Sequence, residues 1–175
     1  MMKRWLLPSL LGLLVAALAW QATLLAIPRG IMSLAVSRLG EAGGLNRMLH
    51  APLPGPGRRT VVRPSPDLAY SSCPFDLSNG PLLVEVAPVA APYWSLSVFD
   101  ARTDVAFVRN NRDTGGRGFR IALATQGQAV PAGVETIRLD DAKGVALLRI
   151  LVEDRARFSS LDRARRGSGC RTVGT

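Results

Sequence analysis

The longest uninterrupted hydrophobic run in the sequence lies close to the N-terminus. Residues Leu6–Ile27 contain no charged side chain, and as an α-helix they would extend about 33 Å, enough to cross the hydrocarbon core of a bilayer. Pro8 falls in the first turn of this helix, while Trp5 and Trp20 suit the two membrane interfaces. The pattern predicts an N-terminal transmembrane anchor over residues 1–27.

A cleavable signal peptide is the alternative for this segment. Residues 1–4 form a basic start, and Ala17-Leu18-Ala19 offers a small-x-small cleavage pattern. Cleavage after Ala19 would leave Trp20–Ile27 as an apolar leader, and the whole run is longer than the usual apolar part of a signal peptide, about 7 to 15 residues. We therefore favour the anchor.

Charges on the two sides of this segment nearly balance. Lys3 and Arg4 precede it, whereas Arg29, Arg38 and Arg47 follow it. The short basic N-terminus before an export-like apolar segment favours a cytoplasmic N-terminus. We expect a single-pass protein of the bacterial inner membrane, in contact with its lipid, with its domain in the periplasm.

Residues 28–59 combine a partly helical pattern with a linker. The apolar positions between Pro28 and His50 predict a short amphipathic helix, interrupted at Gly43–Gly44, that continues from the membrane or lies beside it. Pro and Gly are so dense over Ala51–Arg59 that a linker is expected there. A folded domain should then occupy residues 60–175.

Within that domain, short apolar or β-branched runs alternate with turn signals, which is typical of β-strands. The turn signals at Asn79–Gly80, Asn110–Gly118 and Asp140–Gly144 suit hairpin connections. About eight strands at this spacing predict an antiparallel β-sandwich or barrel-like domain. The predicted strands include Thr60–Arg63, Leu68–Cys73, Leu82–Ala87, Tyr93–Asp100, Asp104–Val108, Val134–Leu139 and Val145–Val152.

The segment Asp154–Arg166 has a helical pattern instead. Asp154 can cap its start, Phe158 and Leu161 share one face, and arginines crowd its last turn before Gly167. One short C-terminal helix packed on the sheet is expected.

Composition and cysteine content restrict the possible functions. The chain has 22 Lys plus Arg against 13 Asp plus Glu, a net charge of +9, but the bases are spread along the sequence without interleaved aromatic residues. This argues against nucleic-acid binding. Cys73 and Cys170 are not spaced as metal ligands. They form either one long-range disulfide, favoured in an oxidising periplasm, or a buried thiol and a free one in the tail.

No catalytic set, metal site or cofactor site is predicted. His50, the only histidine, precedes the linker and is expected to be solvated or interfacial. Ser71 and Ser72 lack a G-x-S-x-G motif and an obvious histidine partner.

Two weaker candidate sites remain in the predicted domain. Asp67, Tyr70, Asp100 and Asp104 lie at or near strand ends and could meet in a polar site, although aspartates there also serve local turns. Tyr93 and Trp94 are adjacent on one predicted strand, so one faces the core and the other could line a ligand or partner surface.

Three segments of the sequence resemble the DUF1254 family of bacterial proteins: RPSPDLAYSS from Arg63, FDLSNGPLLVEVA from Phe75 and YWSLSVFDARTDVAF from Tyr93. Ser65 and Leu68 stand where the family commonly has Asn and Thr. The resemblance implies a sandwich-like envelope domain that is often fused to, or paired with, a DUF1214 domain. Since this chain is too short for both, a separate membrane protein with a DUF1214 domain is the expected partner.

Three functional hypotheses follow. The leading one is a noncatalytic interaction or binding domain tethered to the membrane, which associates through an exposed strand edge or the Tyr93/Trp94 region. The second is an envelope hydrolase that uses Asp67, Tyr70 and Asp100. The third is a carrier with a ligand cavity inside the sandwich.

Overall fold

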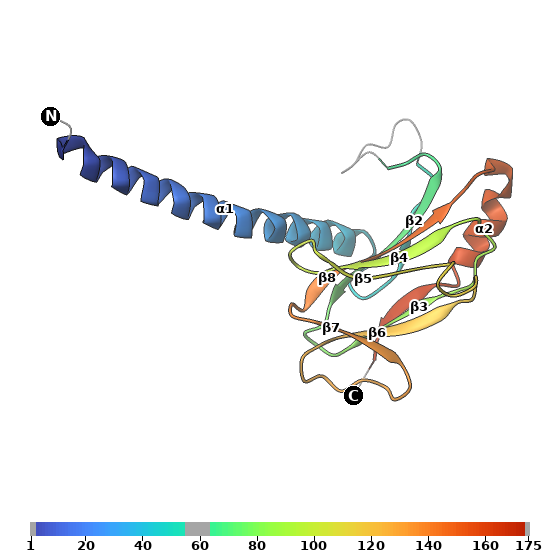
Figure 1. The fold of residues 1–175 in the computed structure, drawn as a ribbon. Helices are drawn as coiled ribbons and strands as arrows, with labels where there is room; N and C mark the ends of the chain where they lie inside the picture. The colour runs from blue at the N-terminus through green and yellow to red at the C-terminus, as the bar shows by residue number, and fades with distance from the viewer. Residues whose placement is uncertain (1–2, 55–63, 174–175) are drawn as a thin grey trace.

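The computed structural model describes residues 3–54 and 64–173. A long N-terminal helix joins a domain of two β-sheets, and a short helix lies at the other end of that domain (Figure 1). The strands are β1 (Leu49–His50), β2 (Leu68–Asp76), β3 (Leu82–Val86), β4 (Trp94–Phe99), β5 (Val105–Asn110), β6 (Phe119–Thr125), β7 (Glu135–Leu139), β8 (Lys143–Leu151) and β9 (Gly169–Thr172).

Helix α1 (Lys3–Gly43) runs without a break from the apolar run into the predicted short amphipathic helix, which therefore continues from the apolar run. Pro28 lies inside it and does not end it. By length and composition α1 could cross a membrane, a property that signal sequences share. The domain also starts before the predicted residue 60, because β1 pairs with β2 at Leu49 and His50. The predicted strand Thr60–Arg63 and the linker from residue 55 onward lie outside the described residues.

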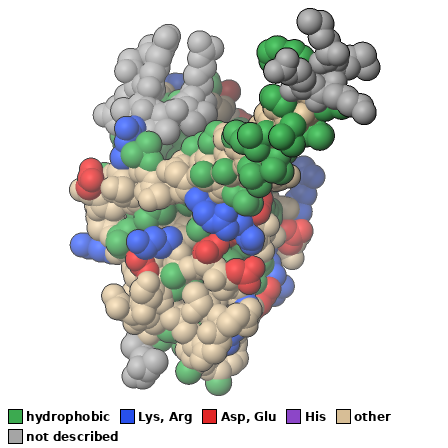
Figure 2. Space-filling view, turned by 90° about the vertical axis from the view of Figure 1, so that its left-hand side faces the viewer, with side chains coloured by type: hydrophobic (Ala, Val, Ile, Leu, Met, Phe, Trp, Pro, Cys, Tyr) green, Lys and Arg blue, Asp and Glu red, His purple; other side chains and the backbone are tan. Residues whose placement is uncertain are grey.

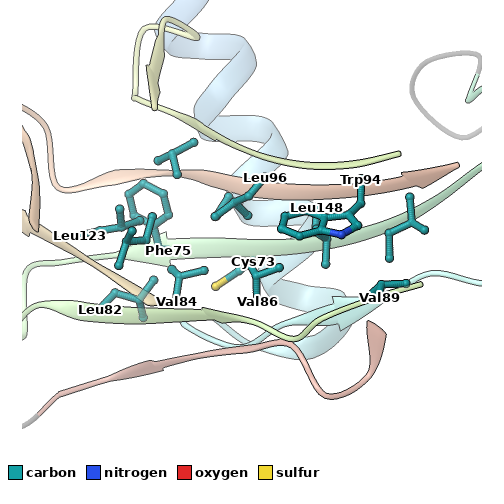
Figure 3. Close-up of a cluster of buried hydrophobic side chains, with 14 of the residues drawn as sticks. Cys73, Phe75, Leu82, Val84, Val86, Val89, Trp94, Leu96, Leu123 and Leu148 are labelled. Atoms are coloured by element: carbon teal, nitrogen blue, oxygen red, sulfur yellow. The ribbon is translucent and has the colours of Figure 1, made fainter. Parts of the chain in front are cut away.

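The sheets form a sandwich and are not closed into a barrel. One sheet has the strand order β1-β2-β8-β4-β5 and the other β7-β6-β3-β9. Side chains alternate along each strand, so every second residue points between the sheets. Figure 3 shows this core, to which β3 contributes Leu82, Val84 and Val86, and β4 contributes Trp94 and Leu96.

The predicted connectivity was wrong at all three turn signals. Asn79–Gly80, Asn110–Gly118 and Asp140–Gly144 each lie between strands of different sheets, so none of them closes a hairpin. Turn residues favour a local reversal of the chain, but they do not specify whether the next strand pairs beside the last one or crosses about 10 Å to the facing sheet. The four-stranded sheet is also mixed, because β6 and β7 run parallel.

The C-terminal helical prediction is confirmed in two parts. The 3₁₀ turn η1 (Arg155–Arg157) is capped by Asp154, whose side chain accepts a hydrogen bond from the Ala156 N–H. Helix α2 (Phe158–Arg165) follows and buries Leu161. Strands β1, β6 and β9 were not among the predicted strands.

The last third of α1 packs against the outer face of the five-stranded sheet. Met32 and Val36, one helical turn apart, are buried against Val145 of β8, and Leu39 and Phe99 complete the cluster. Farther along α1, the Leu49 side chain of β1 packs directly against Gly43. A Cβ atom at position 43 would collide with it. The domain therefore holds one stripe of α1 from Met32 to Gly43.

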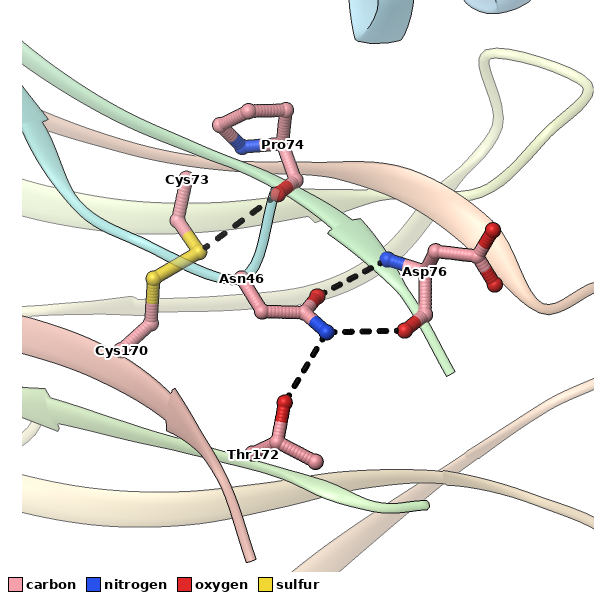
Figure 4. Close-up of a disulfide and its surroundings, with 6 residues drawn as sticks. All are labelled: Asn46, Cys73, Pro74, Asp76, Cys170 and Thr172. Carbon is pink, nitrogen blue, oxygen red and sulfur yellow. Dashed lines mark hydrogen bonds between the residues drawn. A yellow bond between two sulfur atoms is a disulfide. The ribbon is translucent and has the colours of Figure 1, made fainter. Parts of the chain in front are cut away.

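A disulfide joins the two sheets, as in the favoured alternative. Cys73 of β2 and Cys170 of β9 are bonded across the sandwich, 97 residues apart in sequence (Figure 4). Closing a loop of that length lowers the entropy of the unfolded chain and stabilises the fold by about 4.7 kcal/mol on the chain-entropy estimate. Beside it, the Asn46 side chain bonds the Asp76 backbone and the Thr172 hydroxyl, so it also contacts both sheets.

Candidate functional site

The predicted polar site is divided between the two ends of the five-stranded sheet. Asp67 lies beside Val152, to which its carbonyl oxygen is hydrogen-bonded, whereas Asp100 follows Phe99 next to Gly144. Val152 comes eight positions after Gly144 along extended chain, which corresponds to roughly 26 Å at about 3.3 Å per residue. Asp67 and Tyr70 therefore do not meet Asp100 and Asp104, and direct proton transfer between the two pairs is impossible.

Each of these residues has a local role instead. The Asp100 carboxylate accepts hydrogen bonds from the backbone N–H groups of Arg102 and Asp104, which builds the β4–β5 turn. The Tyr70 hydroxyl accepts one from the Ser65 N–H, and the Asp67 side chain is exposed. Asp67, Tyr70 and Asp100 therefore do not form one hydrolase site.

Trp94 is a core residue and does not line a surface. It is completely buried and stacks on Phe119, with the ring centroids 6.0 Å apart. Its indole Nε1 has no hydrogen-bond partner among the described residues. Tyr93 precedes the strand and is half-buried, so only this member of the pair is available to a partner.

The structure instead assembles a buried polar cluster that the sequence did not reveal. It joins His50 of β1, Ser71 of β2 and Arg165 of α2. The Ser71 Oγ lies 2.9 Å from His50 Nδ1 and 3.0 Å from Arg165 Nη1. His50 was expected in solvent or at the membrane interface and Ser71 without a histidine partner; both expectations were wrong, because β1 pairs with β2 and places the two side by side.

Arg165 is the centre of this cluster. Its side chain is fully buried and donates to the backbone carbonyl oxygens of Tyr70 and Ala51, at 2.6 and 2.5 Å. Asp162, one helical turn earlier, pairs with it at 2.7 Å and also with the exposed Arg166. A buried guanidinium is tolerated only when its donors and its charge are satisfied, as they are here.

The cluster also affects the pKa of His50. Burial lowers this pKa below its ordinary value, and the positive charges of Arg165 and Arg166 lower it further, against an opposing effect of Asp162. The imidazole is therefore neutral at pH 7, and its protonation would place another positive charge beside Arg165.

A serine beside a histidine suggests nucleophilic catalysis, but the hydroxyl group of Ser71 is buried. Ser71 is 1% exposed, and its Oγ already contacts both His50 Nδ1 and Arg165 Nη1. The cluster instead connects α2, β1 and β2, because Arg165 of α2 binds Tyr70 in β2 and Ala51 directly after β1. It acts as a structural clamp. No motif marked it, since the residues are 21 and 94 positions apart in sequence.

An open groove of about 590 Å³ lies at one end of the four-stranded sheet, where Glu85 and Arg120 form an ion pair at 3.1 Å beside Gly118 and Gly133. Within residues 3–54 and 64–173, no group of three or more His, Cys, Asp or Glu side chains is arranged to hold a metal ion.

A two-sheet sandwich with a crossing disulfide, joined to a long apolar helix, defines the class of protein. The family model of DUF1254, a protein family of unknown function, matches residues 45–172. The chain belongs to this family, and the resemblance seen in its sequence is confirmed. The match begins at Leu45, directly after α1, in agreement with the early start of the folded domain.

A solved structure shows the same fold. The VPA0106 protein from Vibrio parahaemolyticus is 19% identical and superposes with a TM-score of 0.61 over 79% of this chain, which spans only 34% of that protein. An uncharacterised protein from Burkholderia cenocepacia is 12% identical, with a TM-score of 0.47, 74% of this chain covered and 34% of the other. Comparison with the curated proteins finds no match.

Replacing Arg165 should destabilise the domain far more than replacing its neighbour. In an Arg165→Met protein the Ala51 carbonyl oxygen and the Ser71 hydroxyl lose the guanidinium that they bind, while the Tyr70 carbonyl oxygen keeps only the Ala51 N–H. We expect a loss of about 3 to 5 kcal/mol. Arg166→Met is the matched control, because Arg166 shares Asp162 but is 54% exposed, and a loss below about 1 kcal/mol is expected. Chemical denaturation of both full-length proteins in detergent measures the difference. Equal losses would refute the clamp.

His50 should make the fold sensitive to mild acid. Because its pKa is lower in the folded than in the unfolded chain, its contribution is complete above about pH 6.5 and is lost as the pH falls through the folded value. The free energy of unfolding should therefore decrease between pH 7.5 and 5. In a His50→Gln protein this part of the pH dependence should disappear. An unchanged slope would assign it to other groups.

Proposed function

We propose that this chain is a membrane-anchored, noncatalytic interaction domain of the bacterial envelope. The main support for this proposal is that α1 has two different parts. Its N-terminal part is exposed, and its C-terminal part packs against the domain. The large hydrophobic residues of Trp5–Ile27 are 51–77% exposed in the structure, whereas Met32 and Val36 are buried against the domain. An exposed apolar surface of this size is unfavourable in water and favourable in a bilayer.

The docked part also supports a permanent anchor over a cleaved signal. Cleavage after Ala19 would leave Trp20, Leu24, Leu25 and Ile27 exposed on the mature chain, at 51–66% of their surface. An intact α1 places those residues in lipid and uses the rest of the helix as a structural part of the domain.

We place the domain on the periplasmic side of the inner membrane. The support is the disulfide between Cys73 and Cys170, since such bonds form and persist in oxidising compartments and are rare in the cytosol.

Trapping thiols in intact cells tests this placement. With acid quenching and a maleimide of high mass, the full-length chain should show no reactive thiol, and two after reduction. A reporter fused after Thr175 that is active only in the periplasm should be active. Two free thiols, or a reporter active only in the cytoplasm, would place the domain inside the cell.

Two observations support the interaction role: the greater size of the Vibrio structure that shares this fold, and the exposed edge strand β5. This chain spans about a third of the Vibrio structure that shares its fold, so that protein has further parts beside the common domain. We propose that a separate membrane protein with a DUF1214 domain supplies them here. Strand β5, at the edge of its sheet, exposes Val108 by 51% and can accept another strand.

Co-purification tests the partner and its site together. A tagged chain from detergent-solubilised membranes should retain a DUF1214-domain protein, identified by mass. Val108→Arg, at an exposed position of β5, should abolish its recovery without changing the melting temperature. Ser159→Arg, at an exposed position of α2, is the control and should retain the partner. A lone monomer under several growth conditions would contradict the proposal, and recovery with Val108→Arg would exclude this edge.

A further inference from the structure

The docking of α1 determines how far the domain lies from the bilayer, if the helix is the anchor of the proposed function. Met32, the first buried residue of the docked stripe, comes five positions after Ile27. In an α-helix this is about 7.5 Å along the axis. The headgroup layer on each side of a bilayer is about 5 to 8 Å thick. Met32 therefore lies at the outer limit of that layer.

The domain residues that contact this part of α1 identify the end that faces the lipid. Val145 and Phe99 belong to the cluster that holds Met32 and Val36, and Phe99 is followed directly by the β4–β5 turn, Asp100–Asp104. From Met32 the helix continues away from this turn toward β1, where Gly43 meets Leu49. Figure 1 shows α1 leaving the domain at the end opposite α2. The β4–β5 turn thus lies on the membrane side of the docking contact.

The side chains of this turn suit a surface with both signs of charge. Arg102 lies 3.5 Å from Asp100 and 3.8 Å from Asp104, and it also reaches Asp140 of the β7–β8 turn at 3.5 Å. Asp104 and Asp140 are about three-quarters exposed. Figure 2 shows acidic and basic side chains together below the apolar helix on this end of the molecule. Directly after the turn, Val105 is 57% exposed.

We propose that the β4–β5 turn rests on the headgroups of the bilayer that α1 crosses. The guanidinium of Arg102 binds lipid phosphate, as arginine does in proteins. The carboxylates of Asp104 and Asp140 bind the ammonium groups of zwitterionic lipid, and Val105 contacts the interface beside them. The domain is thereby held against the membrane in one orientation, which leaves α2 and the opposite end of the sandwich directed away from it.

Depth-dependent fluorescence quenching tests this orientation. The two native cysteines are joined in a disulfide, so one introduced cysteine is the only thiol to label. Thr103→Cys at the turn and Ser159→Cys on α2 are compared in vesicles of phosphatidylethanolamine and phosphatidylcholine that contain a headgroup spin label. Quenching should be several-fold stronger at position 103 than at position 159.

A third label separates this inference from the anchor itself. Leu14→Cys, in the exposed apolar part of α1, should be quenched by lipid with a spin label in its acyl chain. If position 14 is quenched but positions 103 and 159 are quenched equally, α1 is an anchor, but the proposed contact between the β4–β5 turn and the headgroups is wrong. If position 14 is not quenched, the anchor fails and the orientation fails with it.

A pair of helix variants tests the physical cause of the contact. Val36→Asp places a charge in the buried contact with β8, so α1 should detach from the sheet and the quenching at position 103 should fall toward that at position 159. Leu34→Asp, on the same helix but 52% exposed, should leave the quenching unchanged. Strong quenching at position 103 in the Val36→Asp protein would overturn the inference, because the contact would not depend on docking.

Discussion

The packing of the two sheets against each other is the interaction on which the rest of this structure depends, and the inward row of β2 shows why. Ala69 and Phe75 of this row fill the core, Cys73 bonds the facing sheet, and Ser71 meets Arg165. The apolar positions of the row supply the burial, while Cys73 and Ser71 attach β9 and α2. A one-residue shift of β2 would turn all four side chains outward.

The outer face of the same sheet performs the second task, which is to hold α1. The helix contributes a narrow stripe of contacts from Met32 to Gly43, and the sheet contributes Val145 and Phe99. Val145 immediately follows Gly144, whose missing side chain leaves room for the Phe99 carbonyl group and the Phe75 ring. Close packing inside the sandwich and docking on its outside are therefore coupled through adjacent residues of β8. In the proposed function, this coupling transmits the orientation of an anchor to the whole domain.

The candidate sites show where reasoning from sequence succeeds and where it stops. The disulfide partners were found because only two cysteines exist, and Asp100 could be interpreted as a turn residue because its partners are two and four positions away. The clamp could not be found. Arg165 resembles its exposed neighbour Arg166 in sequence, and only the fold buries one and leaves the other in solvent. The same limit explains why His50 was expected in solvent or at the membrane interface.

What the sequence by itself determined is local: the apolar helix, most strands and the C-terminal helix, because periodicity and capping depend on neighbouring residues. The DUF1254 motifs also belong to this level. Only the tertiary structure decided which strands share a sheet, that the turns at Asn79, Asn110 and Asp140 cross between sheets, and that Asp67 and Asp100 lie at opposite ends. These features depend on strand pairing and burial between residues far apart in the chain. A local sequence pattern does not specify which distant residues will pair.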